Sequence, residues 1–194
     1  DGKASAATAM VDPGLPDDQR GFLFDKVMAS ASARIEVEDV TVDDEENSKE
    51  RVVKATMRLG GERFTHWFRV SEAKKTFGLL TNWKIENAMI ERVFVESRKV
   101  THFSIGGEKM SVATLTESSS AYIVLYPGVY TITPEETGEY IDAEPRTVLV
   151  RAIEDFDRTR TGARVYLEGT YNDKVAAAAL EAAVALTKSC ATVS

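Results

Sequence analysis

Ser71 and Lys74 have the S-x-x-K spacing with which serine acyl-transfer enzymes place a nucleophile and a lysine one helical turn apart. That chemistry also needs a K-T-G strand and an S-D-N element. The run K-T-F-G at residues 75–78 is interrupted by Phe77, and no S-D-N occurs in the chain. We therefore interpret the match as a coincidence at the end of a strand and expect no activated serine there.

The two histidines, His66 and His102, are the next candidates for chemistry. Each is expected within a strand beside an aromatic residue, Trp67 or Phe103. Two histidines and a carboxylate can bind a transition metal, but the spacings H-x-H and H-x₃-H are absent. We therefore interpret both histidines as partly exposed strand residues, and neither a metal nor a cofactor is expected.

Two acidic stretches could bind cations or work as paired carboxylates. Residues 43–47, D-D-E-E-N, lack the alternating ligands and the glycine of a calcium loop, so a solvated hairpin tip without an ion is predicted. Glu154, Asp155 and Asp157 could pair in a cleft, but spacing does not show that they converge. We interpret this second stretch as a polar linker, and no catalytic residue is assigned.

The aromatic-rich strand around Trp67 is the strongest candidate for ligand binding. Phe64, His66 and Phe68 share one face of this strand, and Trp67 points to the other face. One face must belong to the core, and the other is free to line a concave sheet. The alternative is that both faces are core, because aromatic side chains dominate protein interiors.

Composition excludes several classes of protein. The chain has 194 residues, 43% of them hydrophobic, which is enough to build a core. Residues 1–50 carry 13 of the 31 acidic groups and only 5 of the 24 basic ones. No clustered basic face is present for nucleic acid, and an anionic membrane surface would repel the acidic end. The start of the chain lacks an apolar signal core and is typical of a mature or trimmed end.

Periodicity predicts a helix followed by strands in the first part of the chain. Residues 1–14 are small and polar and are expected to be a linker, and a helix is expected over 15–31. Gly60-Gly61 is typical of a two-residue hairpin turn, since glycine accepts the positive φ that such turns need. The strands predicted around it are residues 34–42, 52–59, 63–70 and 83–85.

A second group of strands and a closing helix are predicted in the remaining chain. Gly106-Gly107 and Pro127-Gly128 again mark turns. The predicted strands are residues 93–95, 100–105, 108–115, 121–126, 129–132, 147–153 and 164–168. Asn172 or Asp173 is expected to cap a helix of about 174–190, whose surface is almost entirely Ala, Val and Leu. Such a helix normally packs on protein, through Val175, Ala179, Ala183 and Leu186 against the body or a neighbouring copy.

The order of these motifs resembles the tandem extracytoplasmic domains of membrane-anchored envelope proteins from actinobacteria, distant relatives of the teicoplanin-resistance-associated membrane protein. The motifs are the two Gly-Gly turns, Phe77 with W-K-I at residues 83–85, Y-P-G-V-Y-T-I at residues 126–132, and an Ala-rich helix that reaches Cys190. The resemblance covers about residues 34–194. It implies that Cys190 pairs with a cysteine beyond Ser194, and it implies no defined chemistry.

Together these inferences give an α+β fold and a function outside catalysis. A cystatin- or NTF2-like domain, a helix on an antiparallel sheet, is expected at 15–83, and a small β-sandwich-like module at 84–155. Residues 156–194 are expected to be a strand and a helix that close the chain, and they could begin a further repeat of the same type. We expect a non-catalytic, extracytoplasmic cell-surface domain that binds cell-wall glycan or an envelope protein or acts as a spacer, with membrane contact only through a segment outside this chain. The alternative is a small-molecule-binding or enzymatic NTF2-like domain.

Overall fold

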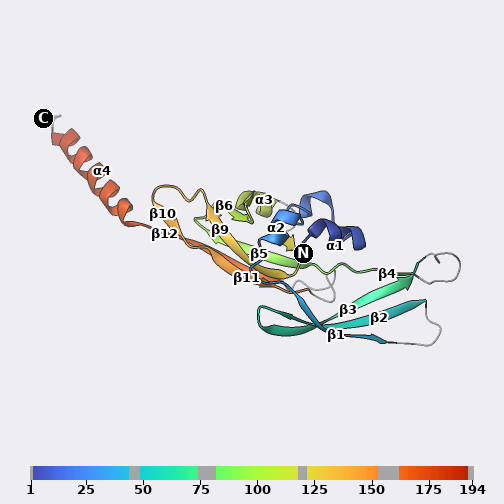
Figure 1. Ribbon diagram of the computed structural model, residues 1–194. Coiled ribbons are helices and arrows are strands. Elements are labelled where there is room, and N and C mark those ends of the chain that lie inside the picture. Colours follow the sequence, from blue (N-terminus) through green and yellow to red (C-terminus); the bar gives the residue numbers. More distant parts are fainter. Residues whose placement is uncertain (1, 44–48, 74–81, 118–121, 153–161, 192–194) are drawn as a thin grey trace.

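The computed structural model describes residues 2–43, 49–73, 82–117, 122–152 and 162–191 (Figure 1). Its helices are α1 (Ala4–Met10), the 3₁₀ turn η1 (Asp17–Gln19), α2 (Asp25–Ala29), α3 (Val112–Glu117) and α4 (Asp173–Ala191). Its strands are β1 (Glu36–Asp43), β2 (Glu50–Leu59), β3 (Glu62–Glu72), β4 (Trp83–Ile85), β5 (Glu91–Arg98), β6 (His102–Ile105), β7 (Glu108–Ser111), β8 (Tyr122–Leu125), β9 (Gly128–Glu135), β10 (Ile141–Ala143), β11 (Arg146–Val150) and β12 (Ala163–Tyr171). The expected α+β class and the C-terminal helix are confirmed.

The strands form three four-stranded sheets. The first has the order β1-β2-β3-β4 and is antiparallel throughout. The second has the order β10-β12-β5-β8, in which β12 and β5 run parallel. The third has the order β11-β9-β6-β7 and is antiparallel. Figure 1 shows the first sheet beside the body that the other two sheets build.

Two glycine pairs make the tight turns that the sequence predicts. Gly60 and Gly61 have φ values of 57° and 86° and join β2 to β3. Gly106 and Gly107 have φ values of 59° and 81° and join β6 to β7. Positive φ at both central residues gives a turn whose twist matches that of the strands it joins. These turns fix the register of both hairpins.

The main core lies between the second and third sheets. Val93, Leu125 and Leu167 come from the second sheet, and Phe103 and Tyr130 come from the third. All five side chains are fully buried. The two sheets therefore enclose one apolar interior.

Strand β12 is built into this interior. Val165 and Leu167 belong to the main core, and residues 163–168 pair with β5 over residues 93–98. The sequence pattern predicts this strand, together with α4, as a closing segment at 156–194 that could begin a further repeat. In the structure the strand completes the second sheet, and only α4 stands apart.

The N-terminal part differs from the sequence prediction in two ways. Residues expected to be a linker form α1, and Ala4 in this helix is fully buried. The long helix expected over 15–31 is reduced to η1 and α2. Its anchors, Phe22 and Val27, enter the main core and do not pack on the first sheet, because Phe22 stacks on Phe103 with ring centroids 6.0 Å apart.

One further prediction changes at the end of a strand, and one helix start agrees with its prediction. The strand expected over 108–115 stops at Ser111, and α3 begins at Val112. Helix α4 begins as predicted, since the Asn172 side chain accepts a hydrogen bond from the Lys174 N–H at 3.2 Å. Among the described residues, no helix has the length and apolar character needed to cross a membrane.

Candidate functional site

The four residues singled out on β3 divide between the two faces of the first sheet. Phe64, His66 and Phe68 point toward the body of the molecule: His66 is fully buried, and the two phenylalanines are half-buried. Trp67 points to the opposite face and keeps 39% of its surface exposed. The structure therefore separates Trp67 from the other three candidates, and only Trp67 is presented to solvent.

His66 is held in an apolar setting. Its ring packs edge-on against Phe68, with centroids 4.6 Å apart, and its Nε2 lies 3.3 Å from the amide nitrogen of Asn87. The Nδ1 atom has no hydrogen-bond partner among the described residues. Burial lowers the pKa of this imidazole, so His66 is neutral at pH 7. A neutral, buried imidazole is a packing residue and is not placed to exchange protons with a substrate.

His102 lies in the other half of the molecule. It starts β6 in the third sheet, and its Nδ1 is 3.4 Å from Glu136 and within hydrogen-bond distance of Thr101. The two histidines thus belong to different sheets. In the part of the chain that the structure describes, no group of three His, Cys, Asp or Glu side chains could hold a metal ion.

Ser71 is engaged with a carboxylate. Its hydroxyl donates a hydrogen bond to Glu86, which follows β4. This hydrogen bond, followed by the nearby charges of Lys84 and Arg69, lowers the pKa of Glu86. Lys74 lies outside the described residues. Ser71 therefore serves as a donor that fixes Glu86, and the described residues place no general base of the serine-hydrolase type beside it.

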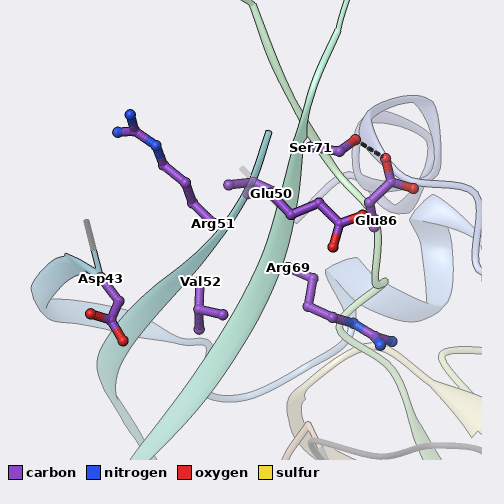
Figure 2. Close-up of a pocket in the computed structure, with 8 residues that line it drawn as sticks. Asp43, Glu50, Arg51, Val52, Arg69, Ser71 and Glu86 are labelled. Atoms are coloured by element: carbon purple, nitrogen blue, oxygen red, sulfur yellow. Dashed lines mark hydrogen bonds between the residues drawn. The ribbon is translucent and has the colours of Figure 1, made fainter. Parts of the chain in front are cut away.

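A groove of about 590 Å³ opens at this end of the first sheet (Figure 2). Its lining comes from four neighbouring segments, the end of β1, the start of β2, the end of β3 and the residue after β4. The lining residues are Asp43, Glu50, Arg51, Val52, Arg69, Val70, Ser71 and Glu86. We call this the polar groove.

The residues that line the polar groove carry charges of both signs. Figure 2 shows the Ser71–Glu86 hydrogen bond on one side and the Arg69 side chain below it. Arg69 makes no ion pair with another residue of the described segments. The Arg51 guanidinium lies on the opposite face of the sheet from Arg69, 4.7 Å from the centre of the Trp83 ring. The polar groove thus offers donors and acceptors side by side at the end of a sheet.

Trp67 extends this groove along the same face. It is two residues from Arg69 on β3 and lies directly opposite Lys54 on β2. Thr41 on β1 is the next residue in the same row. We call the side of the sheet that carries Thr41, Lys54, Trp67 and Arg69 the outer face. It combines one exposed aromatic ring with hydroxyl and cationic donors.

Of the two acidic stretches singled out in the sequence, only the first has described residues at or beside it that line the polar groove. Residues 44–48 lie outside the described residues, but Asp43 and Glu50 on either side of them line the polar groove. Glu154, Asp155 and Asp157 also lie outside the described residues. The prediction of an ion-free tip at 43–47 and of a polar linker near 155 therefore stays a prediction.

Helix α4 carries the remaining sequence candidate, Cys190. The helix leaves the body after β12 and projects away from it (Figure 1), and none of its residues is buried. Leu180 and Leu186 are 67% and 68% exposed. The prediction that the helix presses against the body is wrong for this chain, and contact with a neighbouring copy stays a prediction. Cys190 is a free, exposed thiol.

We expect Cys190 to react as an accessible thiol in the native protein, because the last turn of α4 has no cover. A thiol-reactive dye should label the native and the unfolded protein at similar rates. Mild oxidation followed by non-reducing electrophoresis should give a linked dimer, and Cys190→Ser should abolish it. Labelling only after denaturation would contradict the exposed position of this helix.

No protein-family model, curated protein or solved structure matches this chain. The site is therefore interpreted from its own geometry. Sequence reasoning found Trp67 but missed Arg69, Glu86 and Asn87. The alternation of side chains along residues 63–71 places Arg69 on the face of Trp67, so this signal was present in the sequence. Glu86 and Asn87 are placed by the pairing of β4 with β3, which the sequence does not show.

Proposed function

We propose that this chain is a non-catalytic, extracytoplasmic domain of a cell-envelope protein and that it binds cell-wall glycan on the outer face of the first sheet. The envelope location rests on the resemblance of the short motifs. The description of the first module as cystatin- or NTF2-like likewise remains a prediction. The observation that carries the binding proposal is the position of Trp67, exposed beside the polar groove.

The chemistry of the outer face suits a sugar ligand. Each sugar hydroxyl both donates and accepts hydrogen bonds, so it needs mixed partners such as Arg69, Ser71 and Glu86. The flat apolar side of a sugar ring can pack on an indole ring, which provides a large contact area with little loss of side-chain freedom. Protein interfaces, by contrast, are depleted in Lys, Glu and Asp. A glycan therefore fits this face better than a protein partner.

The same surface argues against catalysis. The carboxyl group of Glu86 is held in its charged form, and the hydroxyl of Ser71 donates to it. General acid–base catalysis near neutral pH favours a group with a pKa close to the working pH. The polar groove is open at the end of the sheet, where water is not excluded. These features support binding by hydrogen bonds and ring contact.

Trp67→Ala is expected to weaken binding of a soluble β-1,4-linked N-acetylhexosamine oligosaccharide by about tenfold, because about 1.4 kcal/mol of ring contact is lost. Isothermal titration calorimetry with purified oligosaccharide measures this directly. Trp83 provides the matched control, since it is 40% exposed but lies on the opposite face of the sheet. Trp83→Ala should bind as the wild-type protein does.

Two results would count against the proposal. The first is that the wild-type protein gives no saturable heat with the oligosaccharide or with purified cell-wall glycan strands, which would exclude glycan as the ligand. Equal losses in Trp67→Ala and Trp83→Ala would show that the outer face is not the binding surface.

A further inference from the structure

A second groove, separate from the polar groove, lies on the inner side of the first sheet. It has a volume of about 310 Å³ and is bounded by α1, by Phe68 on β3 and by the segment from Ile85 to Met89. Tyr126 and Pro127 close it on the side of the body. We call it the apolar groove, because almost all of its lining is hydrocarbon or thioether.

Three methionines give the apolar groove its character. Met10, Met28 and Met89 all line it, from α1, α2 and the segment before β5. Methionine is unbranched and flexible, so its side chain adapts to the ligand that it covers. Met10 is 72% exposed, so most of its side chain is accessible to a ligand in the groove. A chain-like apolar ligand would cover these thioethers.

One cation stands at the groove. Arg34 is the single charged residue among the described residues that line it, and its Nη2 donates one hydrogen bond to the carbonyl of Ala29 at 3.2 Å. Guanidinium carries five donors, so most of them stay available for an anion. The other strongly polar side chain, Asn87, is already engaged with the backbone of Trp67 and Arg69.

We propose that the apolar groove binds a free, single-chain carboxylate amphiphile, with a medium-length acyl chain along the methionines and the carboxylate against Arg34. The volume is at the lower end of the range of about 300–1,000 Å³ typical of small-molecule sites, which favours one chain over a two-chain lipid. The charge complementarity of Arg34 selects an anionic head group over a neutral or cationic one. This site is independent of the outer face and of glycan binding.

The five methionines allow a direct test in solution. Protein labelled with ¹³C at the methionine methyl groups is titrated with sodium decanoate below its critical micelle concentration. Met10, Met28 and Met89 should shift saturably. Met57 and Met110 do not line the groove and serve as internal references, because Met57 is 2% exposed in the first sheet and Met110 packs on the main core.

Variants of the ligand and of the protein then measure separately how the acyl chain and the carboxylate head group contribute to the affinity. Decanoate should bind more tightly than octanoate by about two- to four-fold for each added methylene. Decyltrimethylammonium should bind at least about five-fold more weakly than decanoate, and Arg34→Gln should weaken decanoate by about five-fold. Lys26→Gln removes a neighbouring positive charge that does not line the groove, so it should leave the affinity unchanged.

A filled groove gives a second, structural check. Ala7 lines the groove from α1, and Ala7→Leu keeps a strong helix former while it adds volume. This variant should bind decanoate more weakly while Met57 and Met110 keep their native resonances. The proposal is overturned if decanoate shifts none of the three groove methionines, if all five shift together, or if the cationic amphiphile binds as well as decanoate. If the protein binds phosphatidylglycerol vesicles in preference to decanoate, the proposal that the ligand is a free amphiphile is overturned.

Discussion

Glu91→Gln is expected to remove a pH dependence of stability that amounts to about 3 kcal/mol in the wild-type protein. Glu91 is the first residue of β5 and is only 7% exposed. Burial raises its pKa to about 7, against the opposing effect of hydrogen bonds from the backbone N–H groups of Arg151 and Ala163. The carboxyl group thus links β5 to the end of β11 and the start of β12.

The direction of the effect follows from the two pKa values. The pKa in the folded protein, about 7, lies above the ordinary value of 4.5, so the folded state binds more protons between these limits. The stabilisation is complete below pH 4.5 and is lost as the pH rises through 7. The free energy of unfolding therefore falls with rising pH because of this group. Glutamine cannot ionise, so this contribution is absent in the variant.

Urea unfolding at several pH values between 4 and 9 measures this contribution as a difference between wild type and variant, to within the usual error of extrapolation. Taking the difference removes the titration of other groups, including that of His66. Glu96→Gln on the same strand is the matched control, because Glu96 is exposed and pairs with Arg164 at the surface. It should give a nearly constant difference below about 1 kcal/mol. A flat difference for Glu91→Gln would mean that its carboxyl group titrates normally.

Local patterns in the sequence predicted what local chemistry determines. The two glycine pairs predicted both hairpins, because consecutive positive φ values are specific to this turn. Alternation along β3 correctly separated Trp67 from His66. The capping position at Asn172 and the alanine-rich run predicted α4. In each case the decisive interaction spans only a few residues.

Other features depend on partners far away in the chain. The parallel pairing of β5 with β12 joins residues that lie about seventy positions apart, and nothing in either strand specifies it. The burial of Glu91 follows from this packing, so its raised pKa had no signal in the sequence. Helix α1 is different: its run A-S-A-A-T-A-M contains strong helix formers that were interpreted only as small linker residues.

The largest loss of stability is expected for Phe103→Ala, about 3–5 kcal/mol, because a fully buried aromatic side chain is removed from the main core. Phe103 lies on β6 and stacks on Phe22 with an interplanar angle of 13°. Phe22 is 3% exposed. The contact between these two rings packs the segment before α2 on the third sheet and not on the first. Urea unfolding of the variant gives the loss directly.

A double-mutant cycle with leucine tests that arrangement without unfolding the protein. Phe22→Leu and Phe103→Leu each keep an apolar side chain, and together they should show a coupling of about 0.5–1.5 kcal/mol from the lost ring pair. Phe22→Leu with Phe68→Leu is the control cycle, because Phe68 belongs to the first sheet and contacts His66. Those two substitutions should add to within about 0.5 kcal/mol. Coupling of Phe22 to Phe68 instead of Phe103 would place the N-terminal segment on the first sheet, where the periodicity of the sequence had first suggested it.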